Sequence, residues 1–181
     1  MSNLLLRELS LLGHRCPIIT ADHQDYDRYR KVWNGVADRR PAAIVRPQSV
    51  DDVQKAVHAA AASRALLAVR GGGHSLPGFS TCDAGLVLDL SELTAIAIDR
   101  DTRTIEVGGG ALLGDLDRAT VPEGYVVPAG VISHTCVAGL TPGWRHGMGQ
   151  QEIRPYHRQL AGRGNRDRGW RHHLDKRNVR P

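Results

Sequence analysis

A run of three glycines followed directly by a histidine ends an apolar segment, in the stretch AVRGGGHSLPGFS that spans residues 68–80. Glycine has no Cβ atom and adopts positive φ values freely, so a ligand can approach its backbone closely. Successive backbone N–H groups in such a turn form a concave anion site, which suits a diphosphate. The fingerprint G-x-G-x-x-G is absent, because its sixth position counted from Gly71 is Leu76. The stretch is therefore a candidate phosphate loop of another kind, with a plain tight turn as the alternative.

His74 stands at the tip of this candidate loop. An imidazole beside a bound cofactor could act as a base, as a ligand, or as a nucleophile toward an electrophilic group. A surface histidine that only makes hydrogen bonds is the alternative. The spacing alone leaves both interpretations open.

The segments around the loop alternate between strand and helix patterns. Between the first two expected strands, residues 49–64 predict a helix with Ser49 as the N-cap. Val50, Val53, Val57 and Ala60 recur at helical spacing, which predicts that they form its buried face. Short apolar runs predict strands at 42–47, 66–69, 86–90, 96–99 and 104–107, with a turn at 100–103, a short helix at 111–119, and a turn and strand at 123–130.

Length and composition indicate one domain with a sizeable core, since the chain has 181 residues, of which 41% are hydrophobic. No apolar stretch is long enough for a membrane span, and Arg7 and Glu8 interrupt the apolar N-terminal segment, which argues against a secretory signal. The three cysteines, Cys16, Cys82 and Cys136, are far apart. They predict neither a disulfide framework nor a metal-binding pair, and therefore a reducing, cytoplasmic location.

The net charge of +5 is distributed unevenly along the chain. Residues 1–140 contain 14 basic and 16 acidic residues, whereas residues 141–181 contain 10 basic and 3 acidic residues. The apolar residues of the last segment share no period, so we expect it to be disordered. Its arginines and the pair His172 and His173 could indicate nucleic-acid binding or a metal site. No motif or ligand spacing supports either, and we expect no specific nucleic-acid partner, no metal and no membrane association.

Five ordered blocks carry a resemblance to a known family. They read WNGVADRRPAAIVRPQSVDDVQKAV, VRGGGHSLPGFST, GLVLDLSELTAIAID, TIEVGGGALLGDLD and GYVVPAGVISHTCVAGLT. This part of the chain resembles the FAD-binding domain of the vanillyl-alcohol oxidase superfamily, and within it the berberine-bridge-enzyme-like flavin oxidases. The resemblance implies an α+β fold, with two small α/β subdomains of a PCMH-type FAD-binding domain that is incomplete at the C-terminus. It also implies FAD as the cofactor.

The resemblance assigns candidate cofactor-binding residues to two segments. It implies that the first segment wraps the diphosphate of FAD, and that His74 bonds covalently to a methyl carbon of the flavin ring. A second covalent link through Cys136 is less well supported, because that cysteine falls where relatives have glycine. The implied cofactor-binding residues are Arg70, Gly71, Gly72, Gly73, His74, Ser75 and Gly78 in the first segment and Gly130, Thr135 and Gly139 in the second. It assigns no catalytic residue.

The family pattern sets the expected domain boundaries at 1–28 for an N-terminal extension, 29–141 for a partial FAD-binding domain, and 142–181 for a basic tail. After Thr141 relatives continue with LGGG, whereas this chain does not. Removing one nucleotide from a back-translated sequence near Thr141 or Pro142 restores TLGGGMGWV. We therefore expect a frameshift at this point, with a genuine divergent tail as the alternative.

The function implied by the resemblance is that of the FAD-binding part of a flavin-dependent oxidase. Such an enzyme transfers a hydride from a carbon of a small-molecule substrate to FAD, and oxygen reoxidises the cofactor. We expect this chain to be inactive alone, because the family's substrate domain has no counterpart in it. One alternative is a non-catalytic FAD-binding module that needs a partner chain. Another is a weak, non-specific nucleic-acid binder that acts through its basic tail.

Overall fold

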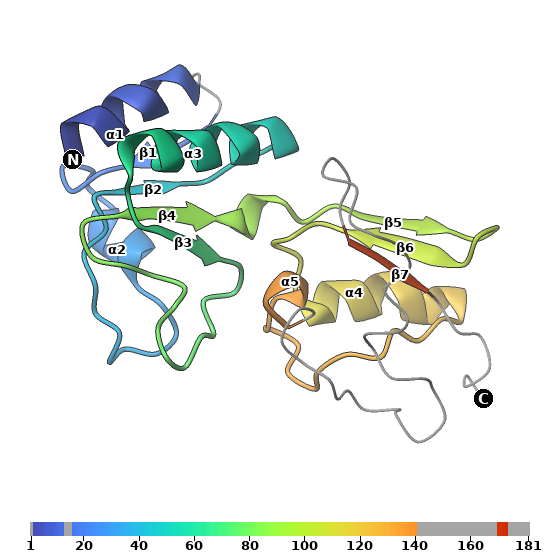
Figure 1. Cartoon of the computed structure of the whole chain (residues 1–181). Helices are drawn as coiled ribbons and strands as arrows, with labels where there is room; N and C mark the ends of the chain where they lie inside the picture. Colours follow the sequence, from blue (N-terminus) through green and yellow to red (C-terminus); the bar gives the residue numbers. More distant parts are fainter. Residues whose placement is uncertain (1, 13–15, 141–169, 174–181) are drawn as a thin grey trace. The chain divides into compact units, whose positions relative to one another are not determined.

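The computed structural model describes residues 2–12, 16–140 and 170–173. The chain forms two compact units, unit 1 (Met1–Leu93) and unit 2 (Thr94–Pro181). Each combines helices with a small sheet, which confirms the predicted α+β class (Figure 1). Each unit is described by itself below.

Unit 1 is built around a four-stranded sheet with the strand order β1-β2-β4-β3. Its strands are β1 (Ile18–Ile19), β2 (Ala43–Val45), β3 (Leu67–Arg70) and β4 (Leu86–Asp89). The last three run parallel, with β4 between β2 and β3, and β1 is antiparallel to β2. The three parallel strands confirm the strands predicted from the apolar runs. Because parallel strands point the same way, β2, β3 and β4 all end at the same edge of the sheet.

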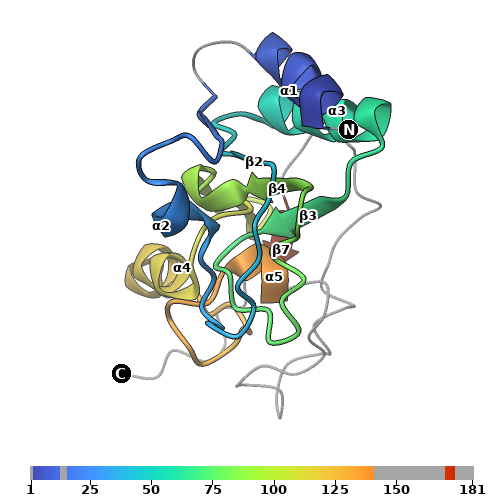
Figure 2. The same ribbon diagram turned by 90° about the vertical axis from the view of Figure 1, so that its left-hand side faces the viewer.

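Helices cover both faces of this sheet. On one side lie α1 (Ser2–Leu9) and α3 (Val50–Ser63), which pack against each other, and α2 (Tyr26–Arg30) lies on the other side (Figure 2). Successive strand residues point to opposite faces of the sheet. Each strand therefore supplies side chains to the core on one face and to the core on the other. Coverage on both sides explains why these strands are continuous apolar runs rather than alternating ones.

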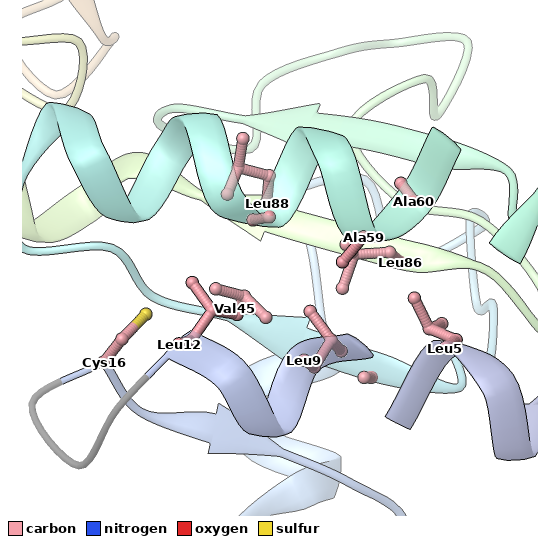
Figure 3. Close-up of a cluster of buried hydrophobic side chains, with 11 residues drawn as sticks. Leu5, Leu9, Leu12, Cys16, Val45, Ala59, Ala60, Leu86 and Leu88 are labelled. Carbon is pink, nitrogen blue, oxygen red and sulfur yellow. The ribbon is translucent and has the colours of Figure 1, made fainter. Parts of the chain in front are cut away.

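The larger core lies between the sheet and the helices α1 and α3. Leucines of α1 and of the 3-10 turn Ser10–Leu12 point toward the sheet and α3 (Figure 3). The buried members of this cluster are Leu5, Leu9, Leu12, Cys16, Ala43, Val45, Ala56, Ala59, Ala60, Leu86 and Leu88. The sequence gives no separate sign of α1, yet Leu5 and Leu9 of this helix are integral to the core, within the segment that the sequence places in an N-terminal extension.

The helix α3 confirms its predicted cap and part of its predicted buried face. The Ser49 hydroxyl accepts a hydrogen bond from the Asp52 N–H at 3.2 Å, as an N-cap should. However, Val50 and Val57 are exposed, and the buried residues are Ala56, Ala59, Ala60 and Ser63. The prediction therefore holds for Ala60, and for Val53, which is partly buried against the core, but was wrong for Val50 and Val57. Small side chains on the buried face allow α3 to lie close to α1 and the sheet.

Unit 2 contains a three-stranded antiparallel sheet with the order β5-β6-β7. The strands β5 (Ile96–Asp99) and β6 (Thr104–Val107) have their predicted bounds. In the turn between them, the Asp99 carboxylate accepts hydrogen bonds from the N–H groups of Asp101 and Thr102. The third strand, β7 (Trp170–His173), pairs with β6.

The core of unit 2 lies beneath this sheet, and two helices contribute to it. The helix predicted at 111–119 is present as α4 (Leu113–Thr120), and α5 (Val137–Leu140) follows later in the chain. The buried members of this cluster are Ile105, Val107, Ala111, Leu113, Leu116, Tyr125, Val127, Val137 and Leu140.

Two segments of unit 2 differ from the predictions. The turn expected near Gly124 is present, with φ of 74° at this residue, but no strand element follows it in the part of the chain described up to residue 140. Pro128 lacks an N–H group for a strand ladder, which explains the difference. Residues 170–173 form a strand where the sequence predicts disorder. The other residues of the expected tail, and with them the proposed frameshift at Thr141 or Pro142, lie outside the described residues.

Among the described residues, no helix is long and apolar enough to cross a membrane.

Candidate cofactor-binding site

The glycine loop begins where β3 ends, at the carboxyl edge of the parallel strands in unit 1. Arg70 is the last residue of β3, and Gly71, Gly72 and Gly73 follow it. Ligands of open parallel sheets bind beyond the carboxyl ends of the strands, so the loop occupies the edge where a cofactor is expected. Gly72 is exposed, Gly71 is half-buried and Gly73 is buried, so the turn faces solvent at its first two glycines.

Two positions in the loop require glycine. Gly73 has φ of 71° and Gly78 has φ of 76°, values that side-chain-bearing residues rarely adopt. A Cβ atom on Gly78 would also lie 2.8 Å from the Cβ of Ala37. The backbone conformation therefore requires glycine at Gly73 and Gly78, as the sequence predicts.

The loop is held by its own turn and by the segment that follows α2. The Ser75 hydroxyl accepts a hydrogen bond from the Phe79 N–H at 3.0 Å. The backbone carbonyl of Ser75 accepts one from the Gly78 N–H, also at 3.0 Å. The Asn34 side-chain amide donates to the Leu76 carbonyl at 2.8 Å. Ser75 and Gly78, both predicted to bind the cofactor, thus shape the loop.

The triple-glycine turn offers donors of the kind that a diphosphate needs. In the described part of the chain, the backbone N–H groups of Gly71, Gly72 and Gly73 donate no hydrogen bond to another backbone carbonyl. At the half-buried Gly71 and the exposed Gly72, the missing side chains leave the amides open to close approach, whereas Gly73 is buried. The residues present therefore fit the diphosphate of FAD.

His74 is half-buried beside the turn and lies against Trp33. Their ring centroids are 5.4 Å apart, with the ring planes inclined by 33°. The Trp33 N–H also donates a hydrogen bond to the Gly73 carbonyl at 3.2 Å. Trp33 therefore contacts both the turn and the imidazole, although its own side chain is 66% exposed.

Arg70 is paired within the protein rather than exposed beside the turn. Its Nη2 atom lies 2.8 Å from Oδ2 of Asp89, and both side chains are 7% exposed. Nη1 lies 3.4 Å from the carbonyl oxygen of Lys31. This guanidinium is therefore placed to hold the protein around the turn.

Gly130, Thr135 and Gly139 belong to unit 2. The Thr135 carbonyl accepts a hydrogen bond from the N–H of Leu113, the first residue of α4, at 2.9 Å. A Cβ atom on Gly130 would lie 3.3 Å from a methyl carbon of the same leucine. Gly139 lies in α5, where it is exposed. The first two residues therefore lie around the start of α4, as one local group.

All three cysteines are buried and unpaired. The Cys136 thiol donates a hydrogen bond to the Gly109 carbonyl at 2.8 Å. This contact gives Cys136 a structural role within unit 2. Burial raises the pKa of the Cys82 thiol. Within the described residues, no group of histidine, cysteine or acidic side chains could hold a metal ion. The side chains of His172 and His173 lie outside that part.

The Cys16 thiol makes the stability of unit 1 depend on pH in the alkaline range. Burial, with a smaller contribution from Asp52, raises the pKa of this thiol from 9.0 to about 11. Above pH 9 the unfolded chain loses the proton while the folded chain keeps it, so the free energy of unfolding falls until about pH 11. Urea unfolding at increasing pH should show a steeper loss of stability in the wild type than in Cys16→Ala. Parallel curves would contradict the prediction.

Sequence reasoning missed two residues that shape the site, Trp33 and Asp89. Trp33 has no local signal, because its contact with His74 bridges distant parts of the chain. Asp89 could have been found, since it ends a predicted strand parallel to the strand that Arg70 ends. Opposite charges at adjacent strand ends predict an ion pair at the edge where the loop begins.

Comparisons with known proteins agree with this arrangement. A family described as "FAD binding domain" matches residues 41–162, which is more than half of the chain. An FAD-linked oxidoreductase of Dictyostelium discoideum is 40% identical over 113 residues, covering 62% of this chain and 25% of that protein. The (R)-6-hydroxynicotine oxidase of Paenarthrobacter nicotinovorans is 34% identical over 140 residues, covering 77% of this chain and 30% of that protein. This chain thus spans less than a third of the length of either relative.

Solved structures give the same result for the fold. The 6-hydroxy-D-nicotine oxidase of Arthrobacter nicotinovorans matches with a TM-score of 0.66 and 32% identity, covering 69% of this chain and 28% of that chain. The wild-type BBE-like 1 protein of Physcomitrella patens matches with a TM-score of 0.78 and 27% identity. The match covers 86% of this chain and 34% of that chain. The chain therefore belongs to the FAD-binding-domain family of the FAD-linked oxidoreductases, in the berberine-bridge-enzyme-like branch of the vanillyl-alcohol oxidase superfamily, and its cofactor is FAD.

Proposed function

We propose that this chain supplies the FAD-binding part of a flavin-dependent oxidase that acts on a small molecule. When bound, FAD would accept a hydride from a substrate carbon and be reoxidised by oxygen. The observation that carries the proposal is the exposed glycine turn at the carboxyl edge of the parallel strands, beside His74. The named oxidases among the relatives also support it.

Each part of the loop has a proposed task. The amides of Gly71 and Gly72, which are half-buried and exposed, bind and orient the diphosphate. The buried Gly73 completes the turn that presents them. Ser75 and Gly78 keep the turn in shape through their hydrogen bonds. In unit 2, Gly130, Thr135 and Gly139 contribute a small-residue surface to cofactor binding. Arg70 supports the turn from inside the protein.

His74 is proposed to bond covalently to the flavin. One imidazole nitrogen would lose its hydrogen and replace a hydrogen of a methyl group on the flavin ring. Dioxygen would take up these two hydrogens, with their two electrons, as hydrogen peroxide. A link of this kind prevents loss of the cofactor. The contact with Trp33 restricts the orientations available to the imidazole before the bond forms.

The 181-residue chain is proposed to bind FAD without turning over substrate by itself, since it spans less than a third of the length of its curated relatives. We propose no specific nucleic-acid partner, since no described element carries a recognition motif. The unpaired state of all three cysteines supports a cytoplasmic location.

The test is a titration of the full 181-residue chain with FAD, followed by visible absorption and by an oxygen-electrode assay. We expect FAD to bind at least about tenfold more tightly than riboflavin, because only FAD offers a diphosphate to the turn. We expect no substrate-dependent oxygen consumption with alcohols, sugars or amines. A folded chain with no preference for FAD would refute the binding proposal. Turnover by the chain alone would refute its inactivity.

The oxygen-electrode assay is then repeated in the presence of a second, flavin-free polypeptide. Activity that appears only after a flavin-free partner chain is added would favour a separate FAD-binding subunit, the alternative left open by the sequence.

A further inference from the structure

We infer that Asp89 is a positioning residue for the cofactor: it holds Arg70, and through Arg70 it sets the shape of the glycine turn. The inference rests on the proposed function, in which that turn receives the diphosphate of FAD. Asp89 itself ends β4 and is 5% exposed. It therefore acts through other residues rather than on the cofactor.

The first link is the ion pair between two adjacent strand ends. Asp89 ends β4 and Arg70 ends β3, and the two residues are partners in the parallel ladder. Oδ2 of the carboxylate lies 2.8 Å from Nη2 of the guanidinium. Both side chains are almost fully buried, so water screens this interaction little. The position of the Arg70 side chain is therefore fixed from β4.

The second link joins Arg70 to the turn. Its Cδ atom lies 3.8 Å from the place where a Cβ atom on Gly73 would stand. Its Nη1 atom contacts the carbonyl of Lys31 at 3.4 Å, and two residues later the Trp33 N–H donates to the Gly73 carbonyl. The Arg70 side chain thus lies beside Gly73 through its Cδ atom, and its guanidinium contacts the segment whose Trp33 is hydrogen-bonded to the turn.

A second arginine shares the same carboxylate. Arg46 directly follows β2, and its Nε atom lies 3.6 Å from Oδ2 of Asp89. Glu92 pairs with Arg46, and the Tyr29 ring lies 4.9 Å from the Arg46 guanidinium carbon. Oδ1 of Asp89 accepts a hydrogen bond from the Ser91 N–H at 3.2 Å. Asp89 therefore connects the ends of all three parallel strands at the edge where the cofactor is expected.

The competing explanation is that Arg70 binds the diphosphate directly. The two explanations differ in what the loss of Asp89 does. If Arg70 acts directly, removing its buried counter-ion leaves it free for the phosphate, and FAD affinity is kept or increased. If Arg70 positions the turn, removing Asp89 releases Arg70 and weakens FAD binding. The burial of both side chains favours positioning.

The first experiment measures FAD and riboflavin affinity of the full chain in Asp89→Asn, Arg70→Gln and the double variant. Asparagine keeps the shape and the acceptor for Ser91 but removes the charge. We expect FAD affinity to fall roughly tenfold or more in each single variant and no further in the double variant. Riboflavin affinity should stay unchanged, since it has no diphosphate. An equal loss for both ligands, additive losses, or unchanged FAD affinity in Asp89→Asn would overturn the inference.

Arg30→Lys is the matched control. Arg30 also lies in unit 1, is also 7% exposed in its side chain, and also pairs with carboxylates, those of Asp27 and Asp38, but makes no described contact with the glycine turn. It should lower stability without changing the preference for FAD over riboflavin. If Arg30→Lys changed the preference for FAD over riboflavin as much as Asp89→Asn does, the loss would reflect any broken buried ion pair in unit 1. The inference about Asp89 would then be wrong.

A second measurement works without the cofactor. Amide hydrogen exchange in residues 71–79 should become faster in Asp89→Asn and stay unchanged in Arg30→Lys. Failure of the wild type to bind FAD would refute the proposed function, whereas unchanged exchange in Asp89→Asn would refute the positioning role. The two ideas can therefore fail separately.

Discussion

The His74→Ala variant is expected to lose all the flavin that stays with the polypeptide after acid precipitation. Acid unfolds the protein and releases any cofactor held only by the folded structure, so acid-stable flavin reports the covalent bond. Reversible FAD binding should change less than about tenfold, because the diphosphate is held by backbone amides that the substitution leaves in place. Fluorescence of the washed precipitate and the mass of the intact chain both measure the result.

His58→Ala is the matched control for this prediction. His58 is an exposed histidine of α3 in the same unit, away from the glycine turn. It should retain the acid-stable flavin of the wild type. Acid-stable flavin that persists in His74→Ala would place the bond on another residue. Its absence from the wild type would limit FAD to reversible binding.

The Leu86→Ala variant is expected to lower the free energy of unfolding of unit 1 by about 2–5 kcal/mol. Leu86 is 0% exposed and lies in β4, the central strand, where its side chain joins the core under α1 and α3. The truncation removes buried methyl groups and leaves a cavity that the surrounding helices and strands fill only in part. Urea unfolding followed by far-ultraviolet circular dichroism measures the change.

Leu66→Ala provides the comparison for Leu86→Ala. Leu66 directly precedes β3 and is 61% exposed, so its truncation should change the free energy of unfolding by less than about 0.5 kcal/mol. Equal losses in the two variants would mean that Leu86 does not contribute to the core as the structure indicates.

The sequence predicted the strands β2 to β6 and the glycine turn because each depends on local signals, but it predicted neither β1 nor β7. Apolar runs marked β2, β3 and β4, and the glycines at 73 and 78 meet a backbone requirement that glycine satisfies alone. The match of β5 and β6 to their predicted bounds has the same cause, since the turn between them is capped by Asp99.

What the sequence did not predict depends on contacts between distant residues. Leu5 and Leu9 of α1 have no partner that the local pattern reveals, and their burial follows from packing on α3 and the sheet. The buried face of α3 was misjudged in part for a related reason, because Val50 and Val57 are exposed while Ala56, Ala59 and Ala60 meet the core. The contact of Trp33 with His74 and the pairing of Arg70 with Asp89 cross long loops. Only the folded chain brings these residues together.

The position of β4 has a consequence for how the chain is made. It is the last strand of unit 1 to be synthesised, yet it occupies the middle of the sheet, with β2 and β3 pairing on its two sides. During translation, β3 therefore has no sheet partner until Asp89 has left the ribosome. Until then the nascent chain exposes apolar segments from α1 to β3, which is the condition in which chaperones bind. A pause in translation soon after this point would allow the sheet to close before unit 2 emerges.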